Sequence, residues 1–234
     1  MNQRTKMNFV LGLLLAAVAL TVTPLAGAQA LHGTGGQAYD SEFFIGPTFL
    51  LSNTVNYDHG TTVNIDSTAG FKIGGYYYLT DHVSIGGSYA YANAGFNATI
   101  GSANNPPGAS TLENGHLYIN QFMFNARYHF LSGALRPYVL GGLGWNYTDS
   151  NVATGYSSGC WWDPWWGYYC GTYAHTKSTN GFTYQVGAGL EVNFSRNFAI
   201  TAGYNETWVD WSHGGTPGFG SVDVNFTWRF PGHY

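Results

Sequence analysis

The segment Ser221–Phe230 reads SVDVNFTWRF. From Val222 on, apolar side chains occupy every second position, and Asp223, Asn225, Thr227 and Arg229 lie between them. Such strict alternation is typical of a β-strand with one apolar and one polar face. A tilted strand of about 9–11 residues is long enough to cross a bilayer. The segment therefore predicts a transmembrane β-strand, with its apolar face toward lipid.

Seven further segments alternate in the same way, at residues 43–52, 71–79, 83–91, 121–130, 139–147, 182–194 and 198–204. Short connections near 80–81, 132–134 and 195–196 separate long polar ones near 53–68, 97–115, 148–180 and 211–220. Tight periplasmic turns and long outer loops alternate in this way in bacterial outer-membrane barrels. We predict an all-β fold: an eight-stranded antiparallel transmembrane β-barrel with short periplasmic turns and long outer loops. Residues 53–67 alternate weakly and could add one more hairpin.

The composition also favours strands that face lipid. Charged residues make up 9% of the chain, against about a quarter in soluble domains, which argues against a soluble β-sandwich. Aromatic residues reach 18%, and we expect them to form two girdles at the membrane surfaces. Phe44, Tyr78 and Tyr138 are assigned to the periplasmic girdle, and Phe96 to the outer one. After the first 30 residues, no apolar run approaches the roughly 20 residues of a membrane helix.

The first residues have the pattern of an export signal. Arg4 and Lys6 precede an apolar stretch, and small residues follow it at Ala28 and Ala30. We expect a Sec-type signal peptide at 1–30, cleaved after Ala28 or Ala30, a short periplasmic segment at 31–40, the barrel at 41–230 and a tail at 231–234. The predicted location is the outer membrane.

The chain resembles a known family at two segments. Residues 136–145, RPYVLGGLGW, are similar to the fifth strand of OmpA-like and opacity-type outer-membrane barrels. The last strand is similar to the carboxy-terminal signal that the barrel-assembly machinery recognises. The resemblance spans residues 40–230 and implies a monomer in contact with outer-membrane lipid and lipopolysaccharide. The chain departs from the family by continuing past Phe230, which we expect to close the sheet against Phe43 and Ile45.

Several charged residues fall on predicted inward faces. Arg127, Glu191 and Arg229 lie near periplasmic strand ends, and Lys72 and Asp223 lie higher. An eight-stranded barrel is only just wide enough for side chains to fill its interior. We therefore predict that these residues form a charge network that plugs the lumen; the alternative is a gate in a narrow pore.

The third long connection contains an aromatic cluster between two cysteines. Cys160 and Cys170 are predicted to form a disulfide, as expected in an exported protein. Six aromatic residues lie between them: Trp161, Trp162, Trp165, Trp166, Tyr168 and Tyr169. Exposed aromatic residues at this density are typical of contact surfaces. We predict contact with a host or glycan ligand or with lipopolysaccharide; a self-packed loop over the barrel mouth is the alternative.

The sequence argues against several other functions. A formal net charge of −4 offers no basic patch for nucleic acid. His82 and Ser84, beside Asp81, have the His-x-Ser spacing of lipid A deacylases but fall at a predicted periplasmic turn. The histidines show no metal-ligand spacing, so no catalytic residue, metal or cofactor is predicted. We expect a structural, surface-interacting barrel rather than an enzyme; a narrow small-solute channel of the OmpW type is the alternative.

Overall fold

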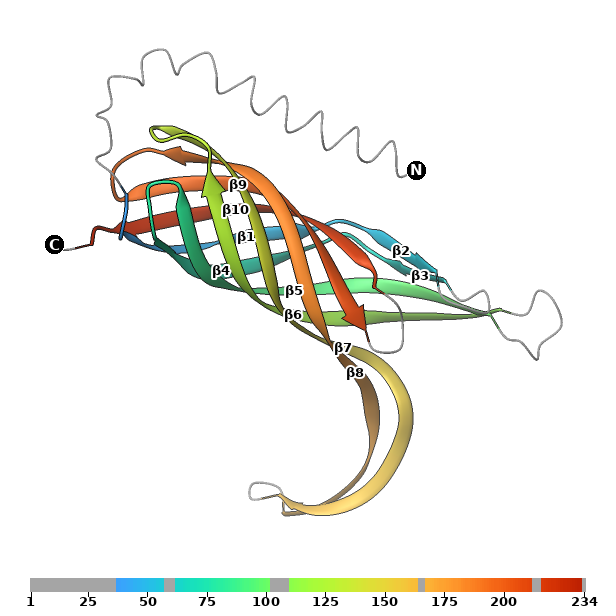
Figure 1. The fold of residues 1–234 in the computed structure, drawn as a ribbon. Coiled ribbons are helices and arrows are strands. Elements are labelled where there is room, and N and C mark those ends of the chain that lie inside the picture. The colour runs from blue at the N-terminus through green and yellow to red at the C-terminus, as the bar shows by residue number, and fades with distance from the viewer. Residues whose placement is uncertain (1–36, 57–61, 102–109, 164–166, 212–215, 233–234) are drawn as a thin grey trace. The chain divides into compact units, whose positions relative to one another are not determined.

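Every strand in the structure, a computed structural model, lies within one continuous antiparallel sheet (Figure 1). The structure describes residues 37–56, 62–101, 110–163, 167–211 and 216–232, without the side chains of 100, 101, 110–114, 151–163, 167–177 and 211. The strands are β1 (Ser41–Leu50), β2 (Asn53–Asn56), β3 (Thr62–Ile65), β4 (Thr68–Tyr78), β5 (Val83–Gly101), β6 (Ser110–His129), β7 (Leu135–Asp163), β8 (Gly167–Asn193), β9 (Phe198–Trp211) and β10 (Gly218–Phe230).

Eight of these strands close into a barrel. Each pairs with its neighbour along the chain, β1 pairs with both β4 and β10, and the β5–β6 ladder completes the ring. Short turns join β4 to β5, β6 to β7 and β8 to β9 at the end where β1 begins and β10 ends (Figure 1). The predicted eight-stranded antiparallel barrel is confirmed.

The closing ladder has a different register from the one expected. Phe230 pairs with Ser41, while Trp228 pairs with Phe43 and Phe226 pairs with Ile45. The expected position of Phe230 against Phe43 and Ile45 is therefore wrong, because its partner Ser41 lies two residues before Phe43 and four before Ile45. In the observed register, Glu42 and Arg229 are direct partners, so two opposite charges inside the barrel lie at the same level.

Much of the sequence expected to form outer loops continues as strands. Within 53–68, β2 and β3 form the additional hairpin, and β3 pairs with β5. Within 148–180, the β7–β8 ladder runs on to Asp163↔Gly167, with register shifts between Asp149 and Gly155. The sequence predicts loops here because these segments lack clear apolar alternation. A strand with water on both faces does not need that alternation, and the Thr, Tyr and Trp residues of these segments favour strands.

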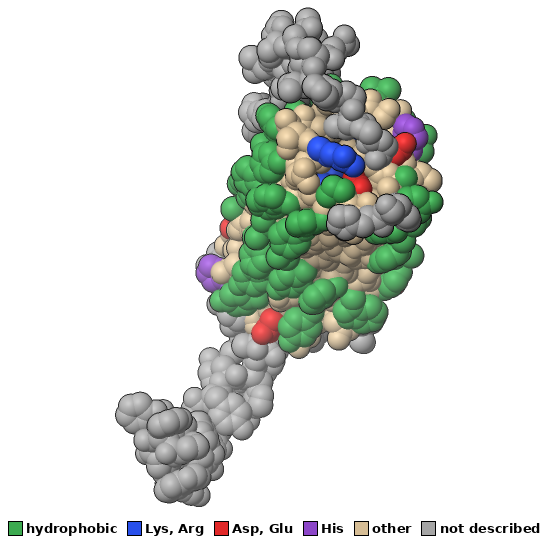
Figure 2. All heavy atoms as spheres, turned by 90° about the vertical axis from the view of Figure 1, so that its left-hand side faces the viewer, with side chains coloured by type: hydrophobic (Ala, Val, Ile, Leu, Met, Phe, Trp, Pro, Cys, Tyr) green, Lys and Arg blue, Asp and Glu red, His purple; other side chains and the backbone are tan. Residues whose placement is uncertain are grey.

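The outer wall of the barrel is apolar. Phe124 and Leu143 are 61% and 58% exposed, and green apolar side chains cover much of the wall in Figure 2. The aromatic girdles were partly mispredicted, because Phe44, Tyr78 and Tyr138 are buried inside the barrel. Phe96 is also buried, in an apolar cluster of the lumen. All four lie at inward positions of the alternating pattern, which excludes contact with the membrane surface.

Two local features lie at the end of the barrel that carries the short turns. Gly133, between β6 and β7, has φ +135°, a conformation that side-chain-bearing residues rarely adopt. Beyond the last paired residue, Gly232 N donates to Asp40 Oδ1 at 3.1 Å, which holds the chain after β10 against the segment before β1. The expected signal peptide and residues 233–234 lie outside the described residues. In the described part of the chain, no helix is long and apolar enough to span a membrane.

Replacing Phe124 by arginine tests whether lipid or water surrounds the outer wall of the barrel. Phe124 lies near the middle of the wall segment of β6 and is 61% exposed. We expect Phe124→Arg to lower the unfolding free energy in lipid vesicles by about 2–4 kcal/mol. The matched control is Ser132→Arg in the exposed β6–β7 turn, where a change within about 0.5 kcal/mol is expected. Equal effects of the two variants would contradict a lipid-facing wall.

Candidate functional site

Two buried carboxylates and three buried guanidinium groups cross the lumen near the short turns. Glu42 lies on β1, Glu191 on β8, Arg127 on β6, Arg136 on β7 and Arg229 on β10. Arg127 Nη2 donates to Glu42 Oε1 at 2.7 Å. Arg229 Nη2 and Arg136 Nη1 donate to Glu191 Oε1 at 2.6 and 3.1 Å. We call these five residues the ionic layer, and it connects five strands across the barrel.

Aromatic side chains fill the space within the ionic layer. Tyr78 is fully buried, and its hydroxyl donates to Glu42 Oε2 at 2.9 Å and accepts from Arg127 Nη2 at 3.1 Å. His129 stacks on the Tyr78 ring with centroids 5.8 Å apart. Tyr138 packs so closely against β8 and β9 that a Cβ at Gly189 would lie 2.6 Å from its hydroxyl oxygen. The ionic layer is therefore packed as a core is, with charges in place of apolar groups.

The segment before β1 covers part of this end. Gln37 Oε1 accepts a hydrogen bond from Arg136 Nη1. Arg136 Nη2 donates to the backbone oxygen of Asp81 at 2.6 Å, and Ala38 N donates to Asp81 Oδ1 at 2.9 Å. Arg136 thus links the ionic layer to the β4–β5 turn and to the segment before β1.

A second ion pair lies further toward the outer end. Lys72 Nζ lies 2.7 Å from Asp223 Oδ2, which also accepts from Asn205 Nδ2 at 2.7 Å. Thr48 Oγ1 donates to the other carboxylate oxygen at 2.6 Å. All four side chains are buried. Asp223 is therefore well satisfied, as a buried charge must be to be stable.

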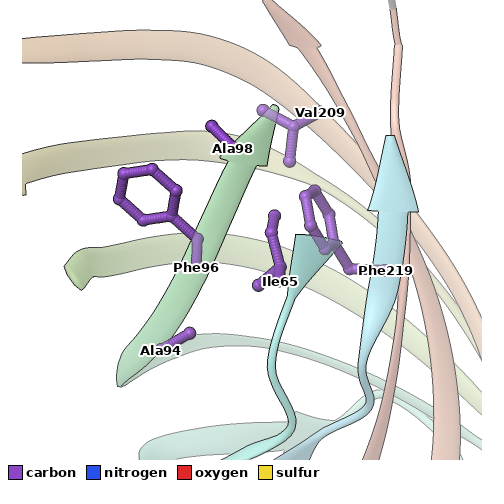
Figure 3. Packing of buried hydrophobic residues seen from close by; sticks show 6 residues of the cluster. All are labelled: Ile65, Ala94, Phe96, Ala98, Val209 and Phe219. Atoms are coloured by element: carbon purple, nitrogen blue, oxygen red, sulfur yellow. The ribbon is translucent and has the colours of Figure 1, made fainter. Parts of the chain in front are cut away.

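Beyond this pair the lumen becomes apolar. Side chains from β3, β5, β9 and β10 form one buried apolar cluster, drawn in Figure 3: Ile65, Ala94, Phe96, Ala98, Val209 and Phe219. We call these six residues the outer cluster. From the turn end outward, the lumen thus contains an ionic layer, a polar zone around Lys72 and Asp223, and an apolar zone.

The structure places the five charged residues predicted from sequence in two groups. Arg127, Glu191 and Arg229 are in the ionic layer, and Lys72 and Asp223 form the separate pair. Sequence reasoning missed Glu42, Arg136 and His129. Each lies an odd number of positions from a lipid-facing residue such as Phe43, Val139 or Phe130. Because successive strand residues point to opposite faces, the alternating pattern predicts that all three point into the barrel.

His82 and Ser84 do not form a nucleophile–base pair. The Ser84 hydroxyl is buried in the lumen and accepts from Arg127 Nε at 3.3 Å. His82 Nδ1 instead lies 2.8 Å from the backbone oxygen of His129, in the turn region. Among the described residues, no group of three or more His, Cys, Asp or Glu could hold a metal ion.

The aromatic segment lies at the far end of the β7–β8 hairpin. Cys160 and Cys170 are direct partners in this ladder, as are Trp161 and Tyr169, and Trp162 and Tyr168. Cross-strand partners have Cα separations of about 4.5–5.5 Å, within the range that a disulfide spans. The side chains of these six residues, and Trp165 and Trp166 altogether, lie outside the described residues, so the disulfide and the aromatic contact surface stay predictions.

A closed antiparallel ring with an apolar outer wall, a charged interior and short turns at one end defines an outer-membrane β-barrel. The chain belongs to the family of the outer membrane protein beta-barrel domain, whose model matches residues 13–230. Its location is therefore the outer membrane. No curated protein sequence matches the chain significantly.

Solved structures share this fold at low sequence identity. OprG from Pseudomonas aeruginosa is 14% identical with a TM-score of 0.54, and the match covers 86% of this chain and 100% of that one. Neisserial surface protein A is 10% identical with a TM-score of 0.53, and the match covers 84% of this chain and 99% of that one. At these identities the likeness shows the fold alone.

Removing one carboxylate should reveal how far the ionic layer holds the barrel together. Glu191→Gln removes the carboxylate that Arg136 contacts and leaves Arg229 with Glu42 alone, in a buried site. We expect the unfolding free energy in lipid vesicles to fall by about 3–5 kcal/mol. Asp210→Asn, at an exposed outer position, is the control and should change it by about 0.5 kcal/mol or less. A loss as small as that of the control would show that the layer contributes little to stability.

Proposed function

We propose that this protein is a non-conducting barrel that anchors outer β-hairpins at the cell surface, where they contact a ligand. The observation that carries the proposal is the ionic layer, which joins both sides of the lumen through direct hydrogen bonds. We propose that the protein acts as a monomer, and closure of the ring within a single chain is compatible with this. Export through the signal peptide at 1–30 and insertion by the barrel-assembly machinery through β10 belong to the same proposal.

The contacts of Arg127 and Arg229 support a closed lumen. Arg127 lies 2.7 Å from Glu42 and 3.9 Å from Glu191, and Arg229 lies 3.4 and 2.6 Å from the same two carboxylates. Each guanidinium therefore bridges carboxylates on β1 and β8, which are not neighbours in the ring. A solute would have to break several buried ion pairs to pass, and each leaves an uncompensated charge.

The length of the β7–β8 hairpin supports a role in surface contact. Among the described residues, β6 pairs with β7 only as far as Leu117↔Ser150, whereas the β7–β8 ladder continues to Asp163↔Gly167. Trp161, Trp162, Tyr168 and Tyr169 of the predicted contact residues occupy this extension, and tryptophan and tyrosine are frequent anchors in binding interfaces. A host glycan or the sugar of lipopolysaccharide is the proposed ligand, since aromatic faces stack on apolar faces of sugar rings.

Conductance measurements test the closed lumen. In planar bilayers we expect the purified protein to give no steady single-channel currents, and in liposomes no swelling with small sugars, because the ion pairs block the lumen. An open porin in the same lipid is the positive control. Reproducible current steps together with swelling would favour the small-solute channel and contradict a closed lumen.

Substitution of the tryptophans tests the contact role. Replacing Trp161, Trp162, Trp165 and Trp166 by serine should reduce adhesion of expressing cells, and binding to a glycan array, by tenfold or more, on the order expected from losing several binding anchors. The fourfold replacement by phenylalanine keeps aromatic rings at these positions and should retain part of the binding. Heat-modifiable migration on gels checks that both variants fold. Unchanged adhesion and glycan binding by a folded serine variant would refute the contact role.

A further inference from the structure

A cavity lies between the polar zone and the outer cluster, on the outer side of the ionic layer. Its size is about 50 Å³, and Lys72, Asp223 and Gln121 line it together with Ile65 and Phe219 of the outer cluster. A space of this size has room for a few water molecules or for an organic molecule of only a few non-hydrogen atoms. We call it the outer chamber.

The outer chamber is lined by both apolar and polar side chains. Leu50, Leu117 and Ile119 also line it, and all three pack against the outer cluster. Most of the exposed lining surface is apolar, and the polar side chains in the lining are those of Thr48, Lys72, Gln121, Asn146, Thr148, Gln185, Thr207, Ser221 and Asp223. A largely apolar pocket with a few convergent polar groups is the usual form of a small-molecule site.

Two hydrogen-bond donors in the chamber have unused capacity. The ammonium of Lys72 carries three N–H groups, and of the described side chains only Asp223 accepts from it. The Nε2 atom of Gln121 is buried and has no hydrogen-bond partner among the described residues. Because a buried donor without an acceptor is costly, both groups favour an incoming oxygen acceptor.

The charges in the chamber determine what kind of acceptor fits. Lys72 and Asp223 are the charged residues of its lining, and they neutralise each other. An anionic head group would stand beside Asp223, and a cationic one beside Lys72, each as an uncompensated charge. A neutral hydroxyl or carbonyl oxygen adds no charge and can accept from both donors.

We propose that the outer chamber binds a small uncharged molecule with an oxygen acceptor and a short apolar body, such as a short-chain alcohol or ketone. Its oxygen accepts from Lys72 Nζ and Gln121 Nε2, and its apolar part lies against Ile65 and Phe219. The ionic layer closes the lumen beneath the chamber, so the molecule binds without crossing the membrane. This site does not depend on the β7–β8 hairpin.

A series of ligands with one chain and three head groups tests the proposal. Backbone amide NMR shifts of the full chain in lipid nanodiscs are followed during titration with 1-butanol, butyrate and butylammonium. We expect 1-butanol to give saturable shifts at residues lining the chamber, and the two ions to give weaker ones. Shifts that rise linearly and fall on lipid-facing residues such as Phe124 would show partition into lipid and overturn the site. Tighter binding of butyrate or butylammonium would overturn the neutral head group.

Variants test the two donors separately from folding. Gln121→Leu leaves the Lys72–Asp223 pair intact and should weaken 1-butanol binding about 2–10-fold, the usual effect of one lost hydrogen bond. The double variant Lys72→Met/Asp223→Asn removes both charges together and should weaken it by a similar factor. Thr227→Val, in the lumen but outside the chamber lining, is the matched control and should leave binding unchanged. Unchanged binding by folded Gln121→Leu and the double variant would refute the role of the donors, while the proposed surface-contact function would stand.

Discussion

In the hydrocarbon of a membrane, an unpaired backbone N–H or C=O has no water to bond, and a sheet edge there is strongly destabilising. The β1–β10 ladder, from Ser41↔Phe230 to Leu50↔Ser221, pairs the two strands that would otherwise remain edges. Closure has a second consequence, because it brings the inward faces of eight strands into one narrow space. Inward polar groups must then find partners across the lumen, and the ionic layer and the Lys72–Asp223 pair are the result.

The ionic layer links walls of the barrel that the backbone does not link directly. Glu42 and Glu191 lie on β1 and β8, which β9 and β10 separate in the ring. Arg229, on β10, reaches both carboxylates, and Arg127 reaches both from β6. Buried pairs of this kind contribute little net stability relative to apolar packing. Their requirement for partners, however, fixes the cross-section and the register, since a shifted β1 would separate Glu42 from Arg229.

The alternation of apolar and polar residues was sufficient to predict the eight strands of the barrel wall, their outward faces and the inward position of charges such as Asp223 and Glu191. It also contained the inward positions of Glu42 and Tyr78. Glu42 was missed because it lies just before the first alternating segment, at 43–52, and Tyr78 was assigned to the membrane surface because it is aromatic. Pairing partners could not be predicted in this way. Alternation gives the face of a residue but not its level in the barrel, and the level depends on how neighbouring strands slide past each other.

In the outer hairpins, the alternation of apolar and polar residues no longer predicts the strands. Pairing of β6 with β7 ends at Leu117↔Ser150, and pairing of β8 with β9 reaches outward to Gly181↔Trp211. Further out, in the described part of the chain, β7 and β8 pair only with each other, so their outer backbone groups need another partner. Water supplies it, which hydrocarbon cannot. The levels of Ser150 and Gly181 therefore set an outer limit for the hydrocarbon region. Beyond them the strands lack a lipid face, and the alternation that identified the rest of the barrel is no longer required.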